Sequence, residues 1–259
     1  MAWNRFPYPE ARYRYDAATL AQHWGRLHGG DAEPFPGQPA LVAAWIAFHA
    51  GHFEQAYTLG LACGVDGYAV AHKAACVHAV YLDSGAEHRI AALEAVTARC
   101  ERQQSEQPGN PAGYYWHAYS LEQYARTISV VKALALGIGL KIRDSLEATL
   151  RLAPGHADAH VAFGVYHAEV IDKEGAMMGG LTHGASKEEG IRHFKTALAL
   201  DPGSARARIE FAHALNMLEG KKKMAEAIGL FEQAAESQSY DAQQRLDVEA
   251  AKEELEQQG

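Results

Sequence analysis

The clearest pattern along the chain is an apolar helical segment that stops at a Pro-Gly pair and is followed by a new alanine-rich segment. One such junction is Pro154-Gly155, and a second, Pro202-Gly203, lies 48 residues further on. Proline cannot continue a helix, and glycine favours its end. Because the residues around the two junctions match in type, the pattern predicts helix–turn–helix units in series, as in an α-solenoid.

Weaker copies of this pattern extend toward the N-terminus, and a stretch rich in Glu and Gln over 242–257 predicts a capping helix. We therefore expect about five helical hairpins and a C-terminal capping helix. The earlier hairpins are predicted from 40–51 with 53–56, from 68–81 with 89–103, and from 114–119 with 142–150, after a junction at 108–111.

The amino-acid composition supports an all-α fold. The chain has 49 Ala among its 259 residues, against 9 Ile and 12 Val. Alanine is the best helix former, whereas strands favour the β-branched residues that are scarce here. Small residues also allow paired helices to approach to about 8 Å. The alanines that we expect at such crossings are Ala44, Ala56, Ala118, Ala197, Ala212, Ala227 and Ala234.

Two units in the C-terminal half resemble the tetratricopeptide repeat (TPR) family, in which small residues and aromatics alternate at helix crossings and proline closes the unit. The resemblance implies a right-handed, TPR-like solenoid of helical hairpins, forming a single domain over 17–259 that binds a peptide or protein in its concave groove. The residues that carry it are Ala157, Phe163-Gly164, Gly190, Phe194, Ala197 and Pro202, then Phe211-Ala212, Ala227, Phe231 and Ala234.

An insert at about 171–187 makes one unit about 14 residues longer than a standard repeat. It contains Met177-Met178-Gly179-Gly180, which we expect to form a flexible crossing, and precedes a helix that should begin at Lys187, with Ser186 as its N-cap. The insert and the following His193-Phe194 resemble two TPR-like families, the T component of TRAP transporters and the regulator of microtubule dynamics proteins. This resemblance implies an alternative function, the binding of a small-molecule ligand.

The TPR resemblance also implies which residues face the concave groove, since these come from the first helix of each hairpin. They mix aromatic and polar groups, which suits a peptide or protein partner. An alternative is that some of the aromatics fill a tightly wound superhelix. The predicted groove residues are Trp45, Phe48, His49, His72, Tyr115, Tyr119, Glu122, Asp158, Glu169, Arg206, His213 and Asn216.

The N-terminal residues 1–16 form a separate segment in this prediction. They are rich in aromatic residues and proline, which disfavours a helix and predicts an extended chain. The segment could pack across the first hairpin, occupy the protein's own groove or exchange with a neighbouring copy. We expect it to pack on the protein's own solenoid in place of an N-terminal cap.

Charge and cysteine content narrow the function further. The formal net charge is -8 at pH 7, and the one basic cluster, Lys221-Lys222-Lys223, is too small to favour nucleic-acid binding. The most apolar stretch, 128–142, is interrupted by lysines and too short to span a bilayer. The first residues lack the basic stretch followed by an apolar run that is typical of a signal peptide. The three cysteines lack the CxxC spacing that is typical of metal and redox sites. We therefore expect a cytoplasmic protein that does not insert into a membrane. Whether it forms a homo-oligomer is left open by the sequence.

The 14 histidines are the candidates for metal chemistry. His160 and His167 share one face of a predicted helix, as a metal pair requires, but no HExxH or CxxC motif accompanies them. Catalytic motifs such as GxSxG are absent. We therefore predict no cofactor, no metal site and no enzymatic activity, and a His-dependent metal protein or enzyme is a second alternative.

Overall fold

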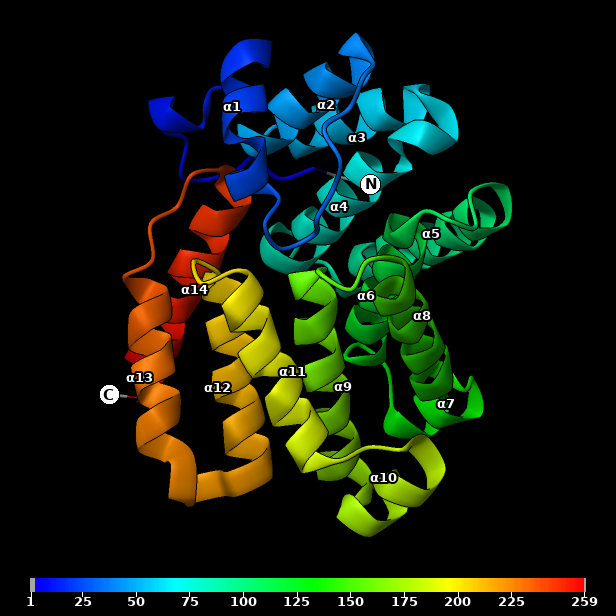
Figure 1. Cartoon of the computed structure of the whole chain (residues 1–259), viewed down its shortest axis with the longest axis vertical. Helices are drawn as coiled ribbons and strands as arrows, with labels where there is room; N and C mark the ends of the chain where they lie inside the picture. Colours follow the sequence, from blue (N-terminus) through cyan, green and yellow to red (C-terminus); the bar gives the residue numbers. More distant parts are fainter. Residues whose placement is uncertain (1–2, 259) are drawn as a thin grey trace. The chain divides into compact units, whose positions relative to one another are not determined.

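Helices form the regular structure of the described part of the chain, residues 3–258 of a computed structural model, and no strand occurs within it (Figure 1). The predicted all-α fold of helical hairpins is thereby confirmed. The chain divides into two compact units. Unit 1 comprises the residues up to His28, Glu33–Pro154 and Tyr240–Gln243, and unit 2 comprises Gly29–Ala32, Gly155–Ser239 and the residues from Gln244 onward. The single domain expected over 17–259 stays a prediction.

Unit 1 contains hairpins formed by α2 with α3, α4 with α5, and α6 with α8. Proline at the first helical position and an Asn110 side chain that accepts from the Ala112 N–H at 3.0 Å explain where α6 begins. The elements of this unit are η1 (Ala11–Tyr13), α1 (Ala17–Leu27), α2 (Pro39–His49), α3 (Phe53–Ala62), η2 (Gly64–Gly67), α4 (Tyr68–Val77), the π-helical turn η3 (His78–Leu82), α5 (Ala86–Glu106), α6 (Pro111–Ala125), α7 (Val130–Ala135) and α8 (Ile138–Leu152).

Unit 2 contains hairpins formed by α9 with α11 and α12 with α13. The predicted N-cap of α11 is confirmed, because the Ser186 hydroxyl accepts from the Glu189 N–H at 3.1 Å. The elements of this unit are α9 (Ala157–Glu174), α10 (Ala176–His183), α11 (Lys187–Leu200), α12 (Ala205–Glu219), η4 (Gly220–Lys223), α13 (Met224–Ala235) and, except for its first two residues, α14 (Ala242–Gln258).

Small residues set the close crossings within both units. All seven alanines predicted for these positions are buried, each at 1% exposure or less. In unit 2 the Phe194 ring lies directly against Gly164, where an added Cβ would come within 2.6 Å of a ring carbon. On its other side the ring stacks on Phe211, with centroids 4.9 Å apart. Phe194 is fully buried and therefore fixes the spacing of α9, α11 and α12.

The described part of the N-terminal segment, residues 3–16, packs on helices of unit 1. Phe6 is buried against the turn between α2 and α3, with its ring 6.3 Å from that of Phe53. The Asn4 N–H donates to His78 Nε2 at 2.8 Å. The segment is less extended than expected, because it includes the short helix η1. Residues 1 and 2 lie outside the described residues.

Three helices were not anticipated from the sequence. A capping box between Asp16 and Thr19 starts α1, and α7 forms inside the apolar stretch after α6. The insert, expected to be a flexible crossing, instead forms the helix α10. Gly175 and Gly184 bound α10 with positive φ angles of 81° and 65°. These two glycines turn the chain sharply enough for α10 to pack back on the end of α9.

Replacement of Gly164 by Ala should destabilise unit 2. Glycine-to-alanine changes within helices usually raise the free energy of unfolding by about 1 kcal/mol. Here the new methyl group meets the immobile Phe194 ring, so we expect a net loss of about 1–3 kcal/mol. Gly229→Ala in α13 is the matched control, because its Cβ would meet no atom within 4 Å. Urea unfolding followed by circular dichroism measures both, and equal stabilisation by the two changes would contradict the proposed crossing.

Candidate partner-binding site

The groove residues predicted in unit 1 lie in its interior. None of them is more than 5% exposed, so in this structure they pack against other helices and offer no surface to a partner. This placement agrees with the alternative that the aromatics fill a tightly wound superhelix. The seven residues are Trp45, Phe48 and His49 on α2, His72 on α4, and Tyr115, Tyr119 and Glu122 on α6.

The chain's own residues Tyr240–Gln243 cover part of this inner face of unit 1. His49 Nδ1 lies 2.7 Å from a carboxylate oxygen of Asp241, and both side chains are almost fully buried. Since a carboxylate only accepts, His49 donates from Nδ1, and Nε2 of a neutral ring then accepts from His28 Nε2 at 3.3 Å. The Tyr15 hydroxyl also donates to the Tyr240 carbonyl at 2.8 Å. Unit 1 therefore binds this segment by a continuous set of polar contacts.

A second buried histidine of unit 1 lies next to a cysteine. His72 Nδ1 is 3.4 Å from Cys100 Sγ, a pairing that elsewhere activates a nucleophilic thiol. Burial here raises the pKa of Cys100 well above its usual value and lowers the pKa of His72 to about 3. Both groups are therefore neutral at pH 7, and the thiolate that such catalysis needs is disfavoured.

The groove residues predicted in unit 2 form a strip along α9 and α12, which run side by side in the same direction (Figure 1). Asp158 and Arg206, each the second residue of its helix, are joined by an ion pair of 3.6 Å. The strip continues about 16 Å along the helices to Glu169, which is partly exposed, and to Asn216, which is exposed. His213 lies between these ends, 3.4 Å from Glu254 of α14. Asn216 and His213 are the most accessible residues of the strip, whereas Glu169 is about as exposed as Asp158.

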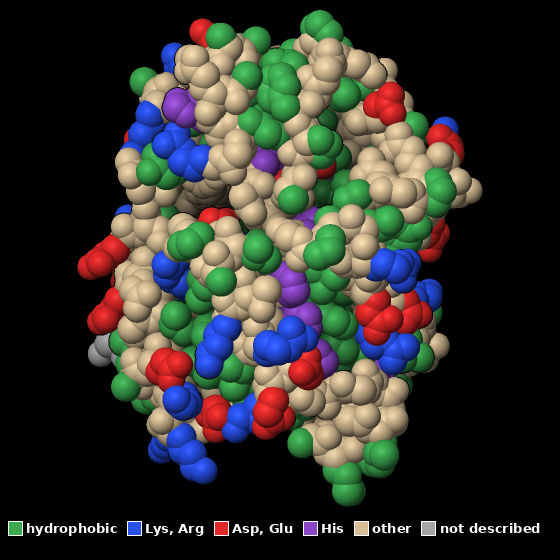
Figure 2. Space-filling view, in the orientation of Figure 1, with side chains coloured by type: hydrophobic (Ala, Val, Ile, Leu, Met, Phe, Trp, Pro, Cys, Tyr) green, Lys and Arg blue, Asp and Glu red, His purple; other side chains and the backbone are tan. Residues whose placement is uncertain are grey.

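Helix α10 adds an exposed apolar surface at this end. It packs on α9, with Gly179 against Val170 and the Tyr166 hydroxyl 3.3 Å from His183 Nδ1. Figure 2 shows hydrophobic side chains gathered at the tip that α10 forms. The exposed apolar residues there are Met177 at 76%, Met178 at 49% and Leu181 at 79%.

Three histidines gather between α9 and α11, and Figure 2 shows histidine side chains in a column over α9. His160 Nδ1 and His193 Nδ1 are 2.8 Å apart, so one must donate and the other accept. His167 Nδ1 accepts from the Ser186 N–H at 3.2 Å. Burial, and next the neighbouring His160, lowers the pKa of His193 to about 3, and burial also lowers the pKa of His167. Among residues 3–258, no three His, Cys, Asp or Glu side chains are arranged to hold a metal ion.

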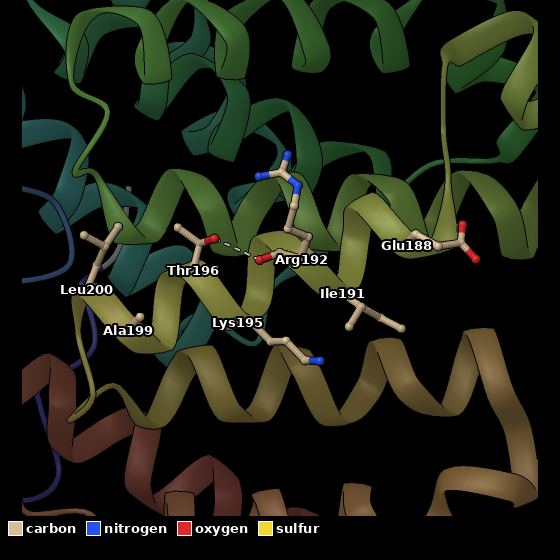
Figure 3. Close-up of a pocket in the computed structure, with 7 residues that line it drawn as sticks. All are labelled: Glu188, Ile191, Arg192, Lys195, Thr196, Ala199 and Leu200. Atoms are coloured by element: carbon tan, nitrogen blue, oxygen red, sulfur yellow. Dashed lines mark hydrogen bonds between the residues drawn. The ribbon is translucent and has the colours of Figure 1, made fainter.

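A shallow depression of about 560 Å³ lies along α11. Figure 3 shows its lining, with Arg192 and Lys195 pointing to opposite sides of the helix and Thr196 donating to the Arg192 carbonyl at 3.0 Å. Because all seven lining residues belong to one helix, the depression does not enclose a ligand in the way that small-molecule sites do.

No family model and no curated protein sequence matches the chain. Among solved structures, the chain matches TTC0263, a thermophilic TPR protein from Thermus thermophilus. The TM-score is 0.57 at 14% sequence identity, and the match covers 82% of this chain and 96% of the other. The fold is TPR-like. The further resemblance to T components and to regulators of microtubule dynamics is not confirmed by this match.

The TPR-like fold explains which site residues could be predicted from the sequence. Asp158, Glu169 and Asn216 follow from their positions in the first helix of a repeat. Asp241 could not be found in this way, because it contacts His49 across 192 residues and precedes a capping helix. His193 was also missed as a partner of His160, since spacing within one helix carries no information about a neighbouring helix. No part of the described chain forms a helix that is long and apolar enough to cross a membrane.

The contact between His49 and Asp241 should contribute measurably to stability. Both groups are buried, so removing either one takes a buried polar contact away from the other. A double-mutant cycle with His49→Gln and Asp241→Asn should give a coupling of about 1–3 kcal/mol in urea unfolding. If the two changes instead had additive effects on the free energy of unfolding, the binding of Tyr240–Gln243 to unit 1 would not depend on this contact.

Acidification should destabilise unit 2 through His193. In the unfolded chain its pKa is 6.5, whereas in the folded unit it is about 3. The unfolded state therefore binds more protons as the pH falls from 6.5 toward 3, and the free energy of unfolding decreases through this window. His193→Gln should reduce the slope of the urea midpoint against pH between about 6.5 and about 4. His213→Gln, at a partly exposed position, is the control, and equal slopes in all three proteins would contradict the assignment.

Proposed function

We propose that the protein is a non-catalytic scaffold that binds a peptide or protein partner at the C-terminal end of the α9–α12 strip, bordered by α10. The observation that supports this proposal is the junction of two kinds of accessible surface. Glu169 and Asn216 provide polar groups toward the C-terminal ends of α9 and α12, and the methionines and leucine of α10, which packs on α9, provide an apolar surface. Protein interfaces combine an apolar centre with a polar rim in the same way.

The composition of α10 also favours a polypeptide partner. Met177 and Met178 are unbranched and flexible, and exposed methionines adapt to side chains of varied shape. A chemically rigid small molecule would instead require an enclosed, preformed pocket.

Two further observations support a non-catalytic role in the cytoplasm. The Cys100–His72 pair is held in its neutral, unreactive form by burial. The three cysteines form no disulfide within the described chain, which is typical of proteins in a reducing compartment.

Photo-crosslinking tests where a partner binds. A benzoylphenylalanine placed at Asn216 should capture a polypeptide in extracts of the source cells, because this side chain is exposed toward the C-terminal end of the strip. The same group at Glu232, exposed on α13, is the matched control. For the captured partner in purified form, Glu169→Lys with Met178→Asp should weaken the Kd about tenfold or more, as expected when an interface loses central contacts.

Two results would count against this site. Equal capture at positions 216 and 232 would indicate nonspecific contact. A Kd that is unchanged by the double substitution, while Glu232→Lys also has no effect, would place the interface elsewhere.

A further inference from the structure

The segment that joins α6 to α8 in unit 1 differs in charge from the rest of the chain. Between residues 126 and 143 there are four cationic side chains and no carboxylate, although the whole protein has a net charge of -8. Arg126 forms an ion pair with Glu122 at 3.1 Å, and Arg143 forms one with Asp144 at 3.0 Å. The remaining two cations, Lys132 and Lys141, are exposed, and the Lys132 ammonium lies 5.5 Å from the centroid of the Tyr124 ring.

The same segment exposes an unusual amount of aliphatic surface. None of the six residues of α7 is buried, and over 130–140 the only charged or polar side chain is that of Lys132. Monomeric proteins rarely expose contiguous apolar patches without a binding role. The exposed side chains are Val130 at 51%, Val131 at 76%, Leu134 at 56%, Leu136 at 45% and Leu140 at 42%.

The distribution of these side chains distinguishes between kinds of partner. A helix that docks in a protein groove presents one apolar stripe and keeps its other faces polar. Aliphatic residues occupy consecutive positions in α7, Val130-Val131 and Leu134-Ala135, and Leu136 follows directly after the helix, so these side chains point in several directions. A fluid apolar phase accommodates such a helix, whereas a preformed groove leaves part of it exposed.

We propose that the α7 surface, defined as residues 126–143, docks on an anionic membrane surface. The aliphatic side chains of α7 enter the boundary between headgroups and acyl chains. Lys132 and Lys141 lie at the level of the lipid phosphates. This arrangement needs no membrane-spanning helix, since interfacial binding combines shallow apolar burial with attraction between basic residues and anionic lipids. It concerns unit 1 and is independent of the partner proposed for unit 2.

Vesicle co-sedimentation with the full chain tests the proposal. Vesicles of phosphatidylcholine with about 40 mol% phosphatidylglycerol should bind the protein at least about tenfold more tightly than phosphatidylcholine alone, and added salt should weaken this binding. Val131→Asp with Leu134→Asp should abolish binding. Lys132→Gln with Lys141→Gln should weaken it about tenfold, because each lysine near the surface contributes separately.

The matched control is Met177→Asp with Leu181→Asp in α10. These side chains are as exposed as those of α7, but in the surrounding segment 171–187 two lysines are balanced by two carboxylates. We expect this control to bind vesicles like the unchanged protein. Circular dichroism verifies that every variant is folded, and a Leu134→Trp variant should show a blue-shifted emission only with anionic vesicles.

Three outcomes would overturn the proposal. Equal binding to neutral and anionic vesicles, or none to either, would remove the charge-based recognition. An equal loss of vesicle binding in the α7 and α10 variants would show that exposed apolar residues bind vesicles without specificity. A dimer in light scattering that Val131→Asp with Leu134→Asp dissociates, without vesicle binding, would assign the surface to a second copy of the chain.

Discussion

The structure depends on how closely paired helices can approach, and in unit 2 this distance is set where Phe194 lies against Gly164. A phenylalanine ring can occupy the crossing only because the facing residue has no side chain. The ring then stacks on Phe211, so one contact connects two successive hairpins. The alanines at the other crossings have the same role, and together they explain why a chain with so much alanine forms two well-packed units. Proline and glycine at the junctions determine where helices end, but small residues at the crossings determine how they pack.

Close packing also determines the state of the histidines. When helices approach this closely, polar side chains between them lose contact with water, and the charged form of an imidazole becomes unfavourable. His72 and His193 are both held neutral, each with a partner on a neighbouring helix. Hydrogen bonding between side chains of neighbouring helices thus accounts for several of the histidines that are candidates for metal chemistry in the sequence. His49 is also buried, and its partners are the carboxylate of Asp241 on one side and the imidazole of His28 on the other.

The sequence was sufficient to predict the fold and the hairpins because their signals are local. Pro154-Gly155 and Pro202-Gly203 end helices wherever they occur, and Ser186 caps a helix through its own neighbours. The binding surface could be predicted only in part. Position in a repeat identifies the helix face of Glu169 and Asn216, but not whether the chain itself covers that face. In unit 1 it does, through Tyr240–Gln243, and a contact across 192 residues leaves no local pattern.

The two apolar surfaces that remain exposed have a common origin in the sequence. Helix α7 lies between the two helices of one hairpin, and α10 lies between the two helices of the next. Neither is needed for the crossings, since the α6–α8 and α9–α11 pairs are held by residues outside them. A loop that is free of packing constraints would normally be polar, because exposed aliphatic side chains lower solubility without adding stability. The two proposed binding surfaces therefore occupy the same position in two hairpins that follow one another along the chain. The charged side chains are balanced around α10, whereas around α7 they are all positive. This difference determines which kind of partner surface each helix can contact.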